Sequence, residues 1–239
     1  MKIAKHLQTI VSGFIIGSSM LLPGISGGTT AIMLGIYDRL IGAVNGIFKK
    51  TVENLIFLGE VCLGGAAGAL LLAKWLLVLS EKFYYPMHIL FAALIAVSIP
   101  LLIKKSEITM NNLYCIIFAA IGAGIAIGVM LLPSSSPSEA NGMEEAVKLL
   151  ISGALISIAL ILPGISTSHI LLTLGIYENV LTAATKPDIL YLLYLGAGVI
   201  VGIFLFTKIL ESAMKRFPTQ VYMLIAGFVI ASLYTIFPS

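Results

Sequence analysis

The sequence predicts an all-α integral membrane protein made of two inverted-topology repeats, each a re-entrant helical hairpin plus two transmembrane helices, joined by one extra transmembrane helix. Three observations predict this fold: the composition, an internal repeat and the placement of lysine and arginine. Of the 239 residues, 59% are hydrophobic and only 10% are charged, and the mean hydropathy is +1.08. Soluble domains carry about 25% charged residues. A net charge of only +3 argues against a nucleic-acid partner.

The chain contains an internal repeat. Residues 12–44 align without a gap to residues 152–184, and thirteen of the 33 aligned positions are identical. Both copies contain the sequences LPGIS and LGIY, and in both an acidic residue follows LGIY. The likeness continues toward the end of each half at an offset of 134. This repeat argues against a secretory signal at the N-terminus, because the same apolar segment recurs where no signal could act.

Each repeat begins with an apolar run that is too short to cross a bilayer. In the first repeat the run covers residues 8–22 and stops at Pro23-Gly24. About 15 helical residues span roughly 22 Å, whereas the hydrocarbon core is about 30 Å thick. A second helix is expected to begin near Thr29. The segment is therefore either one broken helix that crosses or a hairpin that enters and returns.

The basic residues favour the hairpin. Lysine and arginine concentrate in the cytoplasmic loops of membrane proteins. With two hairpins, eight basic residues lie on the cytoplasmic side, together with the N-terminus, and three lie outside; a single crossing by each motif removes this bias. The cytoplasmic set is Lys2, Lys5, Lys49, Lys50, Lys104, Lys105, Lys215 and Arg216, and the outer set is Lys82, Lys148 and Lys186.

The other elements follow from the remaining apolar runs. Three crossings separate equivalent segments of the two halves, so the second half is predicted to be inverted, as in many transporters. The first repeat is expected over 1–105, with a hairpin at 8–48 and transmembrane helices at 54–79 and 87–103. Residues 106–147 hold the connecting helix, 112–132, and an extracellular linker; the second repeat covers 148–239, with a hairpin at 148–184 and helices at 189–210 and 221–237.

The two Pro-Gly breaks are candidate anion sites. Non-helical backbone inside a membrane has to be buried in protein or line a wet cavity, and glycine lets a backbone approach a ligand closely. The helix that starts after each break offers unpaired N–H groups and the positive end of its dipole. The candidate residues are Pro23, Gly24, Ser26, Gly27, Gly28, Thr29 and Thr30 in the first loop, and Pro163, Gly164, Ser166, Thr167, Ser168 and His169 in the second.

Each break also has a purely structural interpretation. Small residues let membrane helices pack closely, and a Pro-Gly break can simply shape a hairpin. Two loops in inverted halves, each followed by a helix start rich in hydroxyl groups, favour binding over packing. The pairs Gly64/Gly68 and Gly198/Gly202 differ, because their GxxxG spacing on long helices is typical of helix packing.

Ionisable residues within apolar segments are functional candidates. The guanidinium of Arg39 suits a phosphate monoester, but Arg39 lies roughly 15 Å along a helix from the loop and equally fits a cytoplasmic mouth, a partner for Asp38 or an interfacial charge. Glu60 is a candidate for proton or cation coupling, or a structural partner of Arg39. Asp38 and Glu178, after the two LGIY copies, are further ion-coupling candidates. His169 either handles an anion or a proton, or is a hydrogen-bonded packing residue.

The segment LLPGISGGTTAIMLGIYDRLI and its partner LPGISTSHILLTLGIYENVL resemble the polyprenyl-phosphate transporter family, PopT (domain of unknown function 368). The likeness covers essentially the whole chain. It implies a multi-pass protein of the bacterial cytoplasmic membrane that returns undecaprenyl phosphate, the lipid carrier of cell-wall precursors, across that membrane. It further implies that both loops handle the phosphate, with Arg39 and Glu60 as supporting charges.

Two other functions stay open. Helix N-termini also serve small-anion channels and exchangers. A lipid-phosphate phosphatase has less support, because the sequence contains no HExxH, GxSxG or Walker motif and no Cys/His metal cluster. We expect a transporter rather than an enzyme, without cofactor or metal. Its expected partners are a polyprenyl phosphate, membrane lipid and either H+ or Na+, with a homodimer as one option.

Overall fold

The computed structural model describes residues 2–20, 26–106, 113–135, 142–186 and 188–236, and helices are the regular secondary structure in these ranges. The helices before residue 107 are α1 (Lys2–Ser19), α2 (Gly27–Met33), α3 (Tyr37–Asn45), α4 (Thr51–Lys82) and α5 (Tyr84–Lys105). They are followed by α6 (Leu113–Met130), α7 (Met143–Ile161), α8 (Thr167–Thr173), α9 (Tyr177–Thr185), α10 (Ile189–Arg216) and α11 (Pro218–Ile236). The all-helical prediction is confirmed for the described residues.

The order and bounds of the helices recur in the two halves. Helices α2 and α3 begin and end 140 residues before α8 and α9, since 167 − 27 and 185 − 45 both equal 140. Helix α4 ends, and α5 begins, 134 residues before the corresponding points of α10 and α11, since 216 − 82 and 218 − 84 both equal 134. These are the same two offsets that relate the halves in sequence, and α6 has no counterpart.

Several helices are long and apolar enough to cross a membrane. Four such spans are Thr51–Leu72, Tyr85–Lys104, Leu113–Met130 and Ile189–Arg216, and Pro218–Tyr234 is a shorter apolar helix. They coincide with the five predicted transmembrane runs. Large apolar side chains on their surfaces, such as Leu70 and Trp75, are largely exposed, as expected for faces that contact lipid. The chain is therefore a multi-pass membrane protein, while its hairpin topology and inversion stay predictions.

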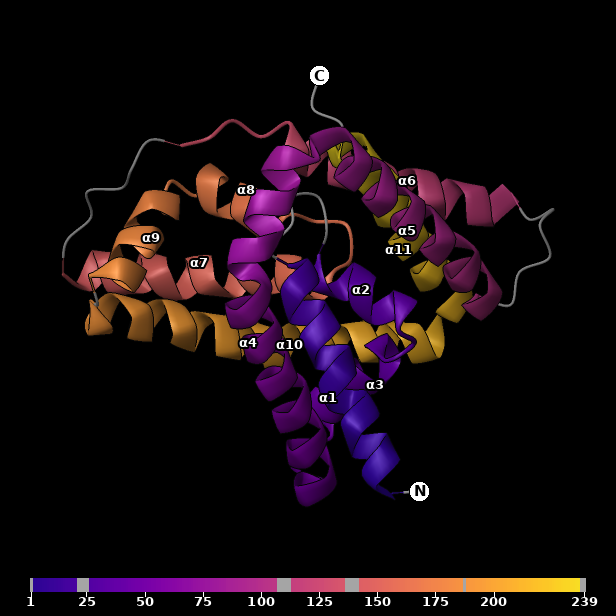
Figure 1. The fold of residues 1–239 in the computed structure, drawn as a ribbon, viewed down its shortest axis with the longest axis horizontal. Helices are drawn as coiled ribbons and strands as arrows, with labels where there is room; N and C mark the ends of the chain where they lie inside the picture. Colours follow the sequence, from indigo (N-terminus) through magenta and orange to yellow (C-terminus); the bar gives the residue numbers. More distant parts are fainter. Residues whose placement is uncertain (1, 21–25, 107–112, 136–141, 187, 237–239) are drawn as a thin grey trace.

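The first helix of each half packs along the long helix of the same half, as α1–α4 and α7–α10 (Figure 1). Glycines make this approach possible. A Cβ atom on Gly64 would lie 2.1 Å from the Ile10 carbonyl oxygen, and one on Gly198 would lie 2.2 Å from that of Leu150. The predicted packing role of both GxxxG pairs is thus confirmed.

Helices α5, α6 and α11 form a third group, in which α11 contacts both others (Figure 1). The side chains of Ile95, Leu102, Ile225 and Val229 are fully buried there. Buried residues of α2 and α3 join the same hydrophobic cluster. The short helices of the first half therefore belong to the core of the molecule.

The short helices of the two halves are not equivalent in their surroundings. Helix α2 is buried from Gly27 to Ile32, and it contacts α5 and α7, while α3 contacts α10. Helix α8 has no buried residue, and α8 and α9 contact α7 and α10 of their own half. The first pair is thus inserted between the halves, and the second pair lies at the side of the molecule (Figure 1).

Candidate functional site

The two motif loops meet at the junction between the halves. The Gly164 N–H donates a hydrogen bond to Ser26 Oγ at 3.1 Å, across 138 residues of sequence. A Cβ atom on Gly28 would lie 3.0 Å from the Ile161 carbonyl oxygen. Predicted residues from both loops are therefore brought together. Pro23 and Gly24 lie outside the described residues.

Tyr37 forms a second link at this junction. Its side chain is 2% exposed, and its hydroxyl donates to the Ile161 carbonyl oxygen at 3.1 Å. Ile161 is the last residue of α7, and the last carbonyls of a helix have no partner within the helix. The chain turns away at Pro163, so a hydroxyl from the other half satisfies this oxygen.

Hydroxyl groups of the first loop are largely satisfied by one another. Ser26 Oγ accepts the Thr29 N–H at 3.2 Å as the N-cap of α2 and lies 2.9 Å from Thr29 Oγ1. Thr30 Oγ1 lies 2.7 Å from Ser19 Oγ on α1. Thr29 and Thr30 are buried. These contacts fix the start of α2 against α1.

A serine of the second loop caps α8 in the same way, but this loop is followed by a contact with α6 rather than with α1. Ser166 Oγ accepts the His169 N–H at 3.4 Å, and Pro163 is fully buried. His169 Nε2 lies 2.9 Å from the Val129 carbonyl oxygen on α6, so the imidazole donates a hydrogen bond there. Thr167 is half-buried and Ser168 is exposed. The structure therefore gives His169 a hydrogen-bonded contact with the connecting helix.

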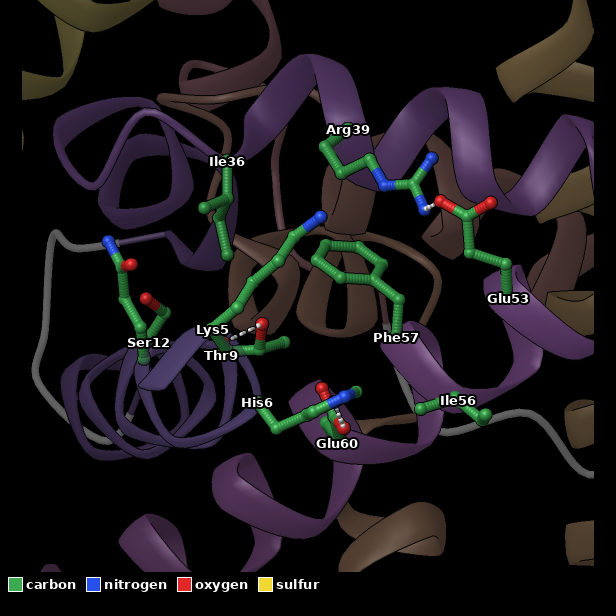
Figure 2. A pocket seen from close by; sticks show the side chains of 11 residues that line it. Lys5, His6, Thr9, Ser12, Ile36, Arg39, Glu53, Ile56, Phe57 and Glu60 are labelled. Carbon is green, nitrogen blue, oxygen red and sulfur yellow. Dashed lines mark hydrogen bonds and ion pairs between the residues drawn. The ribbon is translucent and has the colours of Figure 1, made fainter. Parts of the chain in front are cut away.

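An open cleft of about 700 Å³ lies between α1, α3 and α4 (Figure 2). Charged groups line it from all three helices, and isoleucine and phenylalanine side chains complete the wall. Helix α1 contributes Lys5, His6, Gln8, Thr9 and Ser12, and α4 contributes Glu53, Ile56, Phe57 and Glu60. Helix α3 contributes Arg39, and Ile36 directly precedes this helix.

Two ion pairs cross the cleft. Arg39 Nη2 lies 2.9 Å from Glu53 Oε1, and its guanidinium carbon stands 5.1 Å from the centre of the Phe57 ring, within range of a cation–π contact. His6 Nδ1 lies 2.5 Å from Glu60 Oε1. Glu60 therefore pairs with His6, and the sequence hypothesis of a Glu60–Arg39 pair is wrong. Helix α4 packs along α1, which turns Glu60 toward α1, while Glu53, two turns earlier, meets α3.

The other acidic candidates differ between the halves. Asp38 Oδ1 accepts a hydrogen bond from the Tyr222 hydroxyl on α11 at 2.9 Å, which adds another link between the halves. Its counterpart Glu178 is exposed in the first turn of α9. The two acids that follow LGIY therefore have different environments.

Sequence reasoning missed four residues that the structure brings into these sites: Lys5, His6, Tyr37 and Glu53. His6 is remote in sequence from the motifs, so the motifs give no reason to include it. The packing of α1 along α4, which brings His6 to Glu60, is a feature of the tertiary structure. Tyr37 belongs to the repeated LGIY and was visible as a motif residue, but its partner was not.

Most of the chain is similar to one known protein family. Residues 16–239 match the family described as VCA0040-like, undecaprenyl phosphate translocase-like. The chain belongs to this family. The resemblance drawn from the doubled LPGIS and LGIY motifs is thereby confirmed.

Two relatives carry the same name. The polyprenyl-phosphate transporter of Vibrio cholerae serotype O1 is 30% identical over 260 aligned positions, which cover 99% of this chain and 79% of the relative. The polyprenyl-phosphate transporter of Staphylococcus aureus is 31% identical over 242 positions, which cover 96% of this chain and 85% of the relative. No solved structure matches the chain. Both relatives are named as transporters of a polyprenyl phosphate.

Proposed function

We propose that this protein is a flippase that returns undecaprenyl phosphate, or a related polyprenyl phosphate, across the bacterial cytoplasmic membrane. It works by alternating access of two inverted halves, with its N-terminus in the cytoplasm, and an ion gradient drives it. The family and the names of its relatives support the substrate. The observation that supports this mechanism is the hydrogen bond between Ser26 and Gly164, because it joins the repeated loops at the junction between the halves.

The surroundings of the junction suit the apolar part of a lipid phosphate. An apolar cavity of about 220 Å³ adjoins it, with walls from both halves that include Gly28, Tyr37, Ile161 and Ile203. A phosphate head needs protection from hydrocarbon, whereas an isoprenoid tail can stay in the bilayer. Loops that separate on one side and close on the other would move the head between leaflets while the tail remains in lipid.

The ion that drives this movement is proposed to act through acidic side chains. Glu60 is 15% exposed and is paired with His6. Asp38 and Glu178 are additional candidates, at equivalent positions of the halves.

The first test is movement of labelled undecaprenyl phosphate between leaflets of proteoliposomes. We expect transport by the native protein, strong loss in Arg39→Ala, and a several-fold loss in Ser26→Ala and in Ser166→Ala. Ser26→Ala removes the acceptor of the Gly164 N–H, and a buried donor without a partner costs about 1–3 kcal/mol. Ser134→Ala, at an exposed serine after α6, is the matched control and should transport normally.

The same assay separates the alternatives. Flux of chloride or inorganic phosphate without lipid movement would support a small-anion channel or exchanger and contradict the proposal. Release of inorganic phosphate from the lipid would instead support a phosphatase. Directional transport that is unchanged after both H+ and Na+ gradients are collapsed would contradict ion coupling alone.

A further inference from the structure

Two cationic side chains, Lys5 and Arg39, line the same cleft between α1, α3 and α4. Figure 2 shows the Lys5 side chain extending through the cleft toward Arg39, whose guanidinium faces the same space. Glu53 pairs with Arg39, and Glu60 pairs with His6. Among the described residues, the Lys5 ammonium group has no carboxylate partner. Lys5 and Arg39 therefore stand beside open volume, and the nearby carboxylate of Glu53 contacts Arg39 only, an arrangement that favours a bound anion.

The ion pair between Arg39 and Glu53 is weak. The side chains of Arg39 and Glu53 are 41% and 57% exposed, and ion pairs with this exposure contribute only about 0–1 kcal/mol. A phosphate monoester carries more charge than a carboxylate at neutral pH, and its oxygens match the guanidinium fork. Such an anion would displace Glu53 at small cost.

The volume and lining of the cleft indicate which class of anion fits it. Its volume of about 700 Å³ lies within the range of pockets for small organic molecules, roughly 300–1,000 Å³, and is far larger than a phosphate group requires. The apolar wall of the cleft consists of Ile36, Phe57 and Ile56, with Phe57 between the two isoleucines in the view of Figure 2. Phe57 also lies against the guanidinium of Arg39, which limits the orientations of that group. The cleft thus offers both a charged and an apolar surface.

We propose that this cleft is a docking site for a phosphate monoester with an apolar tail, in which Lys5 and Arg39 bind the phosphate and Glu53 is the counter-ion that the ligand displaces. The first apolar units of the tail lie against Ile36, Ile56 and Phe57. This inference rests on the proposed function, because the transported lipid is the phosphate monoester in question. The cleft residues do not include Ser26 or Gly164, so this site is separate from the loop junction.

The test is binding of farnesyl phosphate, a short probe with the same head and tail chemistry, to the full chain in detergent by isothermal titration calorimetry. Lys5→Gln and Arg39→Gln should each weaken binding about tenfold. Glu53→Gln should leave binding equal or make it tighter, because it removes the competing carboxylate. Lys104→Gln, which removes the same charge at an exposed end of α5, should bind like the native chain.

The sign of the Glu53 effect separates ligand binding from a structural role. If Arg39 and Glu53 served only to hold α3 against α4, both substitutions would weaken binding together, and this outcome would overturn the proposal. Unchanged binding in Lys5→Gln would also overturn it. Farnesol should not bind, and inorganic phosphate should bind more weakly than farnesyl phosphate; equal binding of inorganic phosphate would overturn the role of the apolar wall and make the cleft a site for free anions.

Transport in proteoliposomes distinguishes this inference from the proposed function. Normal lipid movement by native, Lys5→Gln and Arg39→Gln chains would leave the flippase in place and remove the docking site. Farnesyl phosphate could instead bind with the expected variant pattern to a protein that moves no lipid. That outcome would support the docking site and contradict the proposed flippase function.

Discussion

Gly164 is the residue at which the second loop comes closest to the core. Its φ of +83° lies in the left-handed region, and a Cβ atom there would stand 2.3 Å from the Phe228 carbonyl oxygen on α11. Its N–H is also the donor to Ser26. Backbone conformation, close packing and the link between the loops therefore all depend on this one glycine.

We expect Gly164→Ala to destabilise the fold more than a positive φ alone would. Non-glycine residues in unfavourable backbone regions cost about 1–3 kcal/mol, and the contact with Phe228 adds to that cost. Gly142→Ala is the matched control, because Gly142 has a φ of +67° but a Cβ atom there would have no neighbour within 4 Å. The thermal midpoint in detergent measures both. Equal losses in the two variants would show that the close approach is unimportant.

At the scale of elements, the long helices α4 and α10 owe their positions to glycine. On α4, Gly64 and Gly68 face α1, where Cβ atoms would lie 2.1 Å from the Ile10 and Phe14 carbonyl oxygens. On α10, Gly198 and Gly202 face α7 in the same way. Water does not drive helices together inside a bilayer, so close van der Waals contact of this kind has to hold them.

Substitution along one face of α4 tests this packing. Gly64→Ala should separate α4 from α1 and lower the thermal midpoint, because backbone rather than a flexible side chain blocks the new methyl group. Gly59→Ala in the same helix should be neutral or stabilising, since no atom lies within 4 Å and alanine favours helix by about 1 kcal/mol. Thermal unfolding followed by size-exclusion chromatography reports both. Similar losses from the two variants would contradict the packing argument.

At the scale of the whole molecule, similar halves make different contacts. Asp38 on α3 accepts from Tyr222 on α11, and Asn45 on α3 donates to Glu211 on α10 at 2.8 Å. The equivalent helices α8 and α9 pack mainly on α7 and α10 of their own half, with one hydrogen bond from His169 on α8 to α6. If the halves alternate, a second state is expected in which α8 and α9 take the inserted position.

The internal repeat predicts one contact of that second state. The counterpart of Asp38 is Glu178, at an offset of 140, and the counterpart of Tyr222 is His88, at an offset of 134. Glu178 and His88 belong to α9 and α5, which lie at opposite sides of Figure 1. We therefore expect Glu178 to approach His88 when the halves exchange roles.

Cysteine cross-linking measures this exchange, with both native cysteines replaced by alanine. The pair Asp38→Cys/Tyr222→Cys should cross-link in the present state, where these side chains touch. The pair Glu178→Cys/His88→Cys should cross-link only when the second state is populated, and a reversed ion gradient should change the ratio of the two products. Cross-linking of the first pair under every condition, and never of the second, would contradict exchange between the halves.

The composition class, the recurrence of the helices in two halves, the helix break at Pro163-Gly164 and the packing glycines could all be predicted from the sequence. These features depend on hydropathy, local backbone preference and the comparison of one half with the other. All three can be obtained from the amino-acid sequence alone. The family followed from the same motifs.

Which side chains meet depended on the tertiary structure. His6 pairs with Glu60 and Ser26 with Gly164 because α1 packs along α4 and the halves interlock, and sequence distance says nothing about either approach. The unequal burial of α2 and α8 was likewise beyond the reach of the sequence. The flanking LPGIS and LGIY motifs are the same in both halves, but α2 (GGTTAIM) and α8 (TSHILLT) share no identical position, and only packing against the rest of the molecule shows which of the two helices is inserted.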